Sequence, residues 1–372
     1  MRRAAFGSVV GLSLVLALAS AVPLPATPAL TNLPEQLSDQ EFWRLSQSMS
    51  EQGGTFHSDN FVSNEGLFQT VIPDLVRRAR QGGFYLGVGP EQNFTYLAAL
   101  RPKMAFILDI RRGNLHEHLL YKALFEMSAD RADFVSRLFS RVRPASIDPA
   151  ASAGKLFAAF QTGSASEVRF RQNLRDVIDL LTTKRHLPLS AEDREGIEYV
   201  YRTAFFADGP DLNYQLIGQG RGGGRGGGSP TYAQLMATDD GAGQQRSYLA
   251  SEQNFRLVKD LEARNLLVPV VGDFGGPKAL RAIGKYARDN GATIAAFYLS
   301  NVEQYLRQDG KWDAFCANVA TMPLDDSSTF IRSVRGGNGG ARGGFGMFTS
   351  SLGSMRGDTR ACAAPAAASM AR

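Results

Sequence analysis

The chain has 372 residues, of which 44% are apolar, so it is long enough to bury a sizeable core in one or two domains. The net charge of +5 comes from the ends: residues 1–21 carry two arginines and no acid, and residues 333–372 carry five arginines against one aspartate. The region between them is close to neutral, which argues against a nucleic-acid-binding domain.

The first 21 residues are typical of an export signal. Arg2 and Arg3 precede an apolar run at residues 9–18, and residues 19–21 read Ala-Ser-Ala, which matches a cleavage site. The apolar run is too short for a comfortable membrane span. We therefore expect a cleaved signal peptide of residues 1–21, no stable membrane span after cleavage, and a periplasmic or extracellular protein. A misread start of the chain would make it cytoplasmic instead.

The cysteines and histidines limit which disulfides and metal sites the chain can form. The two cysteines, Cys316 and Cys362, are too few for a disulfide-stapled scaffold or a cysteine-based zinc site, and whether they pair is left open. His116 and His118 are two positions apart on a predicted helix, so they point to different faces and are poor co-ligands. We expect no protein-bound metal.

Residues 33–114 are predicted to form the first part of an α/β domain. A capped helix is expected within residues 38–54, where Ser38 and Glu41 match a capping box, and an amphipathic helix from about residue 65 to residue 80. The apolar runs 84–88 and 103–110 predict two strands with a helix between them. Continuous apolar runs separated by helices imply parallel strands buried on both faces.

Residues 115–217 keep helical spacing throughout and predict a large all-helical insertion, in which Ser190 and Asp193 match a second capping box. Residues 218–247 begin with a Gly-rich stretch and are expected to be a flexible loop, which composition favours over an RNA-binding segment.

Residues 248–334 are predicted to complete the α/β domain. The strand candidates are residues 266–274, 292–301, 314–322 and 328–334, and residues 335–372 are expected to be a disordered tail. The predicted fold is α/β, with a doubly wound, mostly parallel Rossmann-like sheet and the large helical insertion.

The glycine turn that follows the first strand constrains the ligand. Gly87 and Gly89 precede a helix, but Gln92 replaces the third glycine of a dinucleotide fingerprint, and no P-loop lysine follows. Glu91 places a carboxylate where a phosphate would bind the helix N-terminus. The turn therefore favours a cationic or uncharged nucleoside over a phosphate.

Four motifs in order resemble the class I S-adenosylmethionine-dependent methyltransferases: "LGVGPE" at 86–91, Asp109 at a strand end, "VGDF" at 271–274 and "FYLSNVEQYL" at 297–306. The resemblance implies S-adenosylmethionine as cofactor, with Asp109 accepting the ribose hydroxyls, Asp273 and its neighbour contacting the adenine, and the fourth motif facing the transferred methyl group. The implied cofactor-binding residues are Gly87, Gly89, Glu91, Asp109, Asp273, Phe274, Ser300 and Asn301. The resemblance identifies neither the catalytic residues nor the methyl acceptor. Other phrases, "GVGPEQN" and "DIRRGN" among them, resemble a bacterial family with no established activity.

Several polar residues keep two interpretations. The segment "SDNFVSNE" at 58–65 is either turn chemistry, which is favoured, or a substrate-side lid that includes Asp59, Asn60, Asn64 and Glu65. Asp109 could instead cap the helix that follows it. The segment 111–114 either lines the cleft or lies in a solvated loop, with the loop favoured. The repeated "EQNF" at 91–94 and 252–255 either starts two helices, which is favoured, or places Glu91 and Glu252 at the cleft.

Two functions follow from this sequence. One is a methyltransferase-like protein that binds a small nucleoside cofactor, with an unknown acceptor; the other is an exported, non-catalytic binding protein on the same fold. The second arises because the methyl donor is made in the cytosol, whereas the leader predicts export. Neither involves nucleic acid, and the oligomeric state cannot be predicted.

Overall fold

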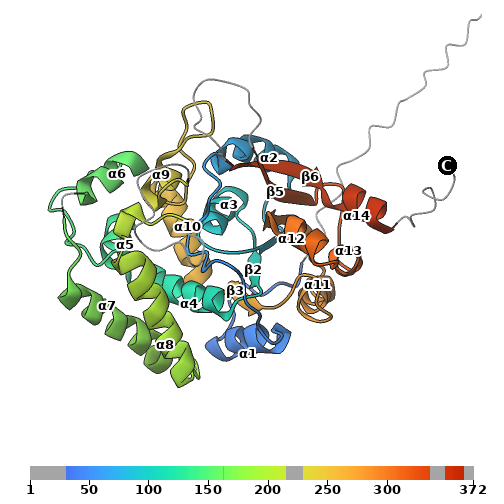
Figure 1. Cartoon of the computed structure of the whole chain (residues 1–372), viewed down its shortest axis with the longest axis horizontal. Coiled ribbons are helices and arrows are strands. Elements are labelled where there is room, and N and C mark those ends of the chain that lie inside the picture. The colour runs from blue at the N-terminus through green and yellow to red at the C-terminus, as the bar shows by residue number, and fades with distance from the viewer. Residues whose placement is uncertain (1–30, 162, 215–228, 336–347, 364–372) are drawn as a thin grey trace, which may run out of the picture. The chain divides into compact units, whose positions relative to one another are not determined.

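A mostly parallel sheet organises the computed structural model, which describes residues 31–161, 163–214, 229–335 and 348–363 (Figure 1). Its six strands lie in the order β3-β2-β1-β4-β5-β6. The neighbours from β3 to β5 pair in parallel, and β6 pairs antiparallel with β5. The strands are β1 (Phe84–Gly87), β2 (Met104–Asp109), β3 (Leu267–Val271), β4 (Ile294–Ser300), β5 (Thr329–Arg335) and β6 (Phe348–Ser354). The mixed α/β class is therefore confirmed, and the expected signal peptide lies outside the described residues.

Strands β1 to β4 are buried on both faces, as their continuous apolar runs predicted. Every residue of β1, β2 and β3 is buried, and in β4 only Ser300 is partly exposed. Pro269 is tolerated within β3 because β3 is the edge strand and its outer side has no ladder partner in the described residues.

The helices are described here in chain order. The α-helices are α1 (Asp39–Met49), α2 (Ile72–Arg78), α3 (Gln92–Leu100), α4 (Arg112–Met127), α5 (Arg131–Leu138), α6 (Ala153–Phe160), α7 (Glu167–Asp179), α8 (Ala191–Val200), α9 (Tyr232–Ala237), α10 (Glu252–Ala263), α11 (Ala279–Asp289), α12 (Val302–Gln308), α13 (Trp312–Ala320) and α14 (Met355–Ala363). Short 3-10 or π turns are η1 (Phe68–Val71), η2 (Leu180–Lys184), η3 (Tyr201–Phe206) and η4 (Gly209–Asp211).

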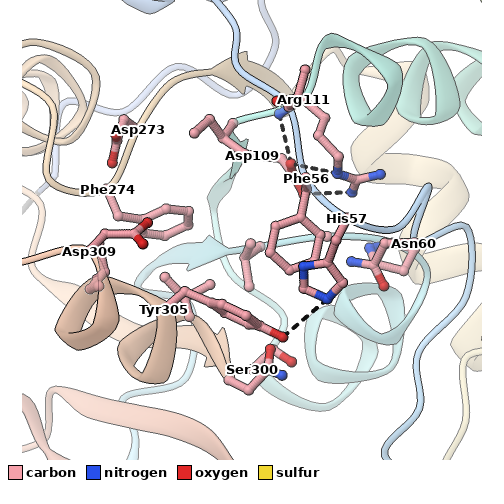
Figure 2. A pocket seen from close by; sticks show the side chains of 18 of the residues that line it. Phe56, His57, Asn60, Asp109, Arg111, Asp273, Phe274, Ser300, Tyr305 and Asp309 are labelled. Carbon is pink, nitrogen blue, oxygen red and sulfur yellow. Dashed lines mark hydrogen bonds and ion pairs between the residues drawn. The ribbon is translucent and has the colours of Figure 1, made fainter. Parts of the chain in front are cut away.

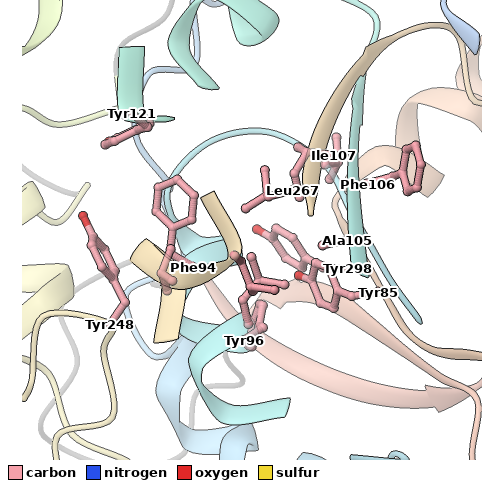
Figure 3. Packing of buried hydrophobic residues seen from close by; sticks show 14 of the residues in the cluster. Tyr85, Phe94, Tyr96, Ala105, Phe106, Ile107, Tyr121, Tyr248, Leu267 and Tyr298 are labelled. Carbon is pink, nitrogen blue, oxygen red and sulfur yellow. The ribbon is translucent and has the colours of Figure 1, made fainter. Parts of the chain in front are cut away.

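Helices α4 to α10 separate β2 from β3 in the chain, and α5 to α8 fall within residues 115–217, for which a helical insertion was predicted. Helix α4 joins the two regions, since it packs against β2 and β3 and also against α8 and α10. An aromatic cluster supports this junction: the ring of Phe94 lies 4.9 Å from that of Tyr121 and 5.3 Å from that of Tyr248, measured between centroids (Figure 3). Both predicted capping boxes are present, at Ser38 with Glu41 and at Ser190 with Asp193.

Three predictions of local structure were wrong. Residues 314–322 lie mainly in helix α13 rather than a strand, because Phe315, Val319 and Met322 recur at helical spacing and are all buried. The segment 218–247 contains helix α9, which Thr231 and Gln234 start with a capping box.

The tail from residue 335 was expected to be disordered, but it contains β6 and α14. Strand β6 is rich in serine, threonine and glycine and is only partly buried, so composition did not reveal it. Backbone pairing with β5 over seven registered residue pairs holds it in the sheet.

Two further features concern the cysteines and the length of the apolar helices. Cys316 on α13 is disulfide-bonded, and Cys362, the other cysteine of the sequence, lies within α14, which packs against α13. Among the described residues, no helix has the length and apolar content needed to cross a bilayer.

Candidate functional site

A cavity of about 600 Å³ lies at the carboxyl ends of strands β1 to β4 (Figure 2). The sheet order reverses between β1 and β4, and in open α/β sheets ligands bind at this switch point. The turn after β1 lines the cavity through residues 88–90, and the end of β4 lines it through Ser300 and Asn301. The ends of β2 and β3 contribute Asp109, Asp273 and Phe274.

The structure brings together most of the residues that the sequence singled out. Those that line the cavity are Gly89, Asp109, Asp273, Phe274, Ser300, Asn301, Asn60 and Asn64. Those that do not line it are Gly87, Glu91, Asp59 and Glu65.

The two glycines of the turn have different roles. Gly89 has φ +71°, a left-handed conformation that favours glycine, and it faces the cavity. Gly87 lies beside Asn93, whose Oδ1 would be 1.8 Å from a Cβ at position 87. The amide of Asn93 donates to the carbonyls of Val88, Gly89 and Pro90 at 2.9, 3.2 and 2.8 Å. Gly87 therefore makes room for the side chain that holds the turn, rather than for a ligand.

The turn is also held from behind by His118. Its Nε2 lies 2.9 Å from the carbonyl oxygen of Gly89, whereas Nε2 of His116 lies 2.9 Å from Asp193. The two imidazoles thus have different partners, as their spacing predicted. Burial lowers the pKa of His118 to about 4, so its ring is neutral at physiological pH.

Glu91 does not present a carboxylate to the cavity. It is fully buried at the start of α3, and the backbone N–H of Ser63 donates to its two carboxyl oxygens at 3.3 Å. Burial raises the pKa of Glu91 to about 8, so the group is mostly a neutral acid at pH 7. Its expected role as an anion that faces the ligand is not supported, because it lies behind the cavity wall.

Asp109 lines the cavity but already has a partner. Arg111 donates to its Oδ1 from the backbone N–H at 2.9 Å and from Nε at 3.1 Å, and to Oδ2 from Nη2 at 2.8 Å. A carboxylate has about four acceptor positions, so one position on Oδ2 remains for a ligand. Arg111 also lines the cavity, although a solvated loop was favoured, and helix α4 begins without a side-chain cap.

Asp273 and Phe274 line the cavity beyond the end of β3, next to Asp109 on the neighbouring strand. The Asp273 carboxylate accepts the backbone N–H of Gly275 at 2.9 Å and pairs with the ammonium of Lys311. Phe274 is only 5% exposed, with its ring against Phe297, and contributes an apolar surface to the cavity.

The sequence did not reveal the aromatic residues at the mouth. Phe56 packs edge-on against Tyr305 with centroids 4.9 Å apart, and the Tyr305 hydroxyl lies 3.4 Å from Nε2 of His57 (Figure 2). Phe56 and His57 precede the polar segment 58–65 in a loop without periodicity, so no pattern marked them. Their rings place apolar surface beside the polar strand ends.

Glu65 lies directly behind the wall at β4. It is fully buried, and its Oε1 accepts the hydroxyls of Tyr298 and Ser300, both at 2.8 Å. Burial raises the pKa of Glu65, and the hydroxyl and amide donors around it oppose that rise. Glu65 was expected on the substrate side, and it reaches that side only through these two hydroxyls.

Two other expectations concern residues outside the cavity. Glu252, the start of the second "EQNF", pairs with Arg131 at 3.1 Å and does not line the cavity. Phe94 and Phe255, the last residues of the two copies, are both buried, as expected if each copy starts a helix that packs on the core. Within the described ranges, no three histidine, cysteine, aspartate or glutamate side chains are grouped so that they could hold a metal ion.

Comparison with known proteins identifies a family whose function is unknown. A family model described as a domain of unknown function (DUF7790) matches residues 60–150 and 152–347, which is well over half of the chain. The chain belongs to this family. The match covers the strand ends of the cavity but not Phe56 and His57 at its mouth. No curated protein matches the chain.

Proposed function

We propose that the cavity binds S-adenosylmethionine and that the protein is methyltransferase-like, with a Rossmann-like, doubly wound sheet. One observation carries the proposal: the motifs that resemble the methyltransferases, far apart in the sequence, meet at one cavity. Gly89, Asp109, Asp273 and Ser300 lie at the carboxyl ends of four adjacent parallel strands, and the strand order reverses between β1 and β4.

The residues present fit the nucleoside in part. A volume of about 600 Å³ is within the range of small-molecule sites. Asp109 would accept a ribose hydroxyl, and Asp273 and Phe274 would contact the adenine. Because Arg111 occupies three acceptor positions of Asp109, we expect one ribose hydroxyl to bind there, rather than the two that the sequence suggested.

The charge of the cavity also favours this ligand class over a nucleotide. Three carboxylates, of Asp109, Asp273 and Asp309, line it together with Arg111 and Lys311, which are paired with the first two. Asp309 is therefore a further negative charge on the wall, which repels phosphate and attracts a cation. When bound, S-adenosylmethionine supplies an electrophilic methyl group, and the chain's own residues would bind it, orient it and exclude water.

A non-catalytic binding protein is the second candidate. The disulfide at Cys316 is typical of an oxidising compartment, where the methyl donor is not made. The two candidates share the cavity and differ in whether a methyl group is transferred.

Isothermal titration of the folded mature protein with S-adenosylmethionine and S-adenosylhomocysteine tests the proposal, with ATP as the phosphate-bearing control. We expect heat from both adenosyl ligands and none from ATP. Binding of neither adenosyl ligand would overturn the proposal, whereas binding without methyl transfer to any offered acceptor would favour the second candidate.

A further inference from the structure

The wall of the cavity at β4 presents two hydroxyl groups whose hydrogens are already committed. Tyr298 and Ser300 flank a register shift at the end of β4, and both residues line the cavity. Each donates its hydrogen to Oε1 of Glu65 at 2.8 Å. A hydroxyl has one hydrogen, so only the oxygen lone pairs of these groups remain for a ligand.

The opposite oxygen of Glu65 fixes this arrangement. Its Oε2 accepts Nε2 of Gln92 at 3.1 Å and the hydroxyl of Ser350 at 2.7 Å. In the ionised state of Glu65, four donors fill the four acceptor positions of the carboxylate. The buried network therefore holds both cavity hydroxyls as acceptors.

The backbone at Ser300 adds an independent sign of a built site. Ser300 has φ +49°, in the left-handed region that a serine rarely adopts, and it is the last residue of β4 before α12 begins at Val302. Strain of this kind persists where the surroundings over-determine it, and here the hydrogen bond to Glu65 helps to hold the side chain in place.

We propose that Ser300 and Tyr298, oriented by Glu65, bind an amine on the ligand through their lone pairs. This inference rests on the proposed function, because the resemblance places the end of β4 opposite the transferred methyl group. The wall requires a methyl acceptor that can donate a hydrogen bond, which excludes a carboxylate or a phosphate without a hydrogen. Of the acceptors that remain, we propose a neutral amine, which can donate an N–H hydrogen bond to the wall and keep its lone pair for the methyl group.

Two probes isolate this wall in a binding experiment. S-adenosylhomocysteine has a neutral sulfur where the methyl group departs, whereas sinefungin has an amine at that position and otherwise the same nucleoside and amino-acid ends. We expect wild-type protein to bind sinefungin roughly tenfold to a hundredfold more tightly, as charge-assisted hydrogen bonds require. Tyr298→Phe and Ser300→Ala should each reduce this preference about tenfold or more, with little change in the affinity for S-adenosylhomocysteine.

Ser350→Ala is the matched control. It removes a hydrogen bond of the same kind from Glu65, but Ser350 does not line the cavity, so the preference for sinefungin should persist. Glu65→Gln is the second variant, because a glutamine amide can donate to the two hydroxyls and turn their hydrogens toward the cavity. It should abolish the preference while the protein remains folded by circular dichroism.

The outcomes are separable. Equal affinity of wild-type protein for the two probes, or a preference that survives both Tyr298→Phe and Ser300→Ala, would overturn the inference and leave the proposed function standing. Binding of neither probe would overturn the proposed function and the inference with it.

Discussion

Arg111 donates three hydrogen bonds to the carboxylate of Asp109, two residues before it in the chain. The side chains are 11% and 6% exposed, so the pair is nearly buried at the rim of the cavity. Asp109, which we propose to bind a ribose hydroxyl, therefore also stabilises the local structure through this pair.

Asp109→Asn should lower both stability and affinity. Loss of one partner from a buried pair leaves Arg111 without its countercharge, which costs about 3 kcal/mol of unfolding free energy. Loss of the remaining Oδ2 acceptor should weaken S-adenosylhomocysteine binding about tenfold or more. Urea denaturation and titration calorimetry on the same variant measure the two effects. A variant with unchanged stability and unchanged affinity would show that the pair contributes to neither folding nor ligand binding.

Asp273→Asn should be milder. Its partner Lys311 is 43% exposed, and pairs of that kind contribute little, so we expect a loss below about 1 kcal/mol in urea denaturation. Affinity should fall less than in Asp109→Asn, since Asp273 would contact only the adenine edge. The reverse ranking of the two variants in calorimetry would contradict the proposed orientation of the nucleoside.

Gly87→Ala should destabilise the protein by about 2–4 kcal/mol. The new Cβ would displace Asn93 and leave the carbonyls that it holds without a donor. Gly113→Ala in the first turn of α4 is the control, because a Cβ at position 113 would meet no atom within 4 Å and alanine favours a helix. Thermal melts of both variants compare them. A melting temperature of Gly87→Ala equal to that of Gly113→Ala would exclude a packing role for Gly87.

Glu91→Gln should become progressively more stable than the wild type as the pH rises. In the unfolded chain the carboxyl titrates near 4.5, and in the folded protein near 8. Between these values the folded state binds one more proton, so its contribution to stability is lost as pH rises through 8. Since one group changes the unfolding free energy by at most about 1.4 kcal/mol per pH unit, melts at pH 6, 7 and 8 should show a widening gap. A constant gap would mean that Glu91 is ionised when folded.

The sequence predicted those parts of the fold that depend on a pattern within a single helix or strand. The apolar runs of β1 to β4 and the capping boxes at Ser38 and Ser190 depend on neighbouring residues, and the structure has them where they were expected. Strand β6 depends on pairing with a distant strand, and its own composition gives no sign of that.

The candidate site also combines features that local sequence patterns predict with features that depend on packing. Strand ends such as Asp109 and Ser300 could be predicted to meet, since parallel strands end at one edge. The different roles of Gly87 and Gly89 could not, because they depend on where the Asn93 side chain packs. The partner of Asp109 was two residues away in the sequence, yet only the geometry shows that Arg111 turns back onto it.

The hydrogen bond between Ser350 and Glu65 joins residues 285 positions apart, and this affects how the protein can be made. A chain synthesised or threaded through a membrane from its N-terminus reaches Glu65 early and Ser350 near the end. Until β6 arrives, the buried carboxylate lacks one of its four donors and β5 has an unpaired edge. The last strand to emerge thus completes the back of a wall whose front faces the ligand, and contacts of such long range slow folding. Chains that are cut short before residue 348 should therefore be both poor folders and poor binders.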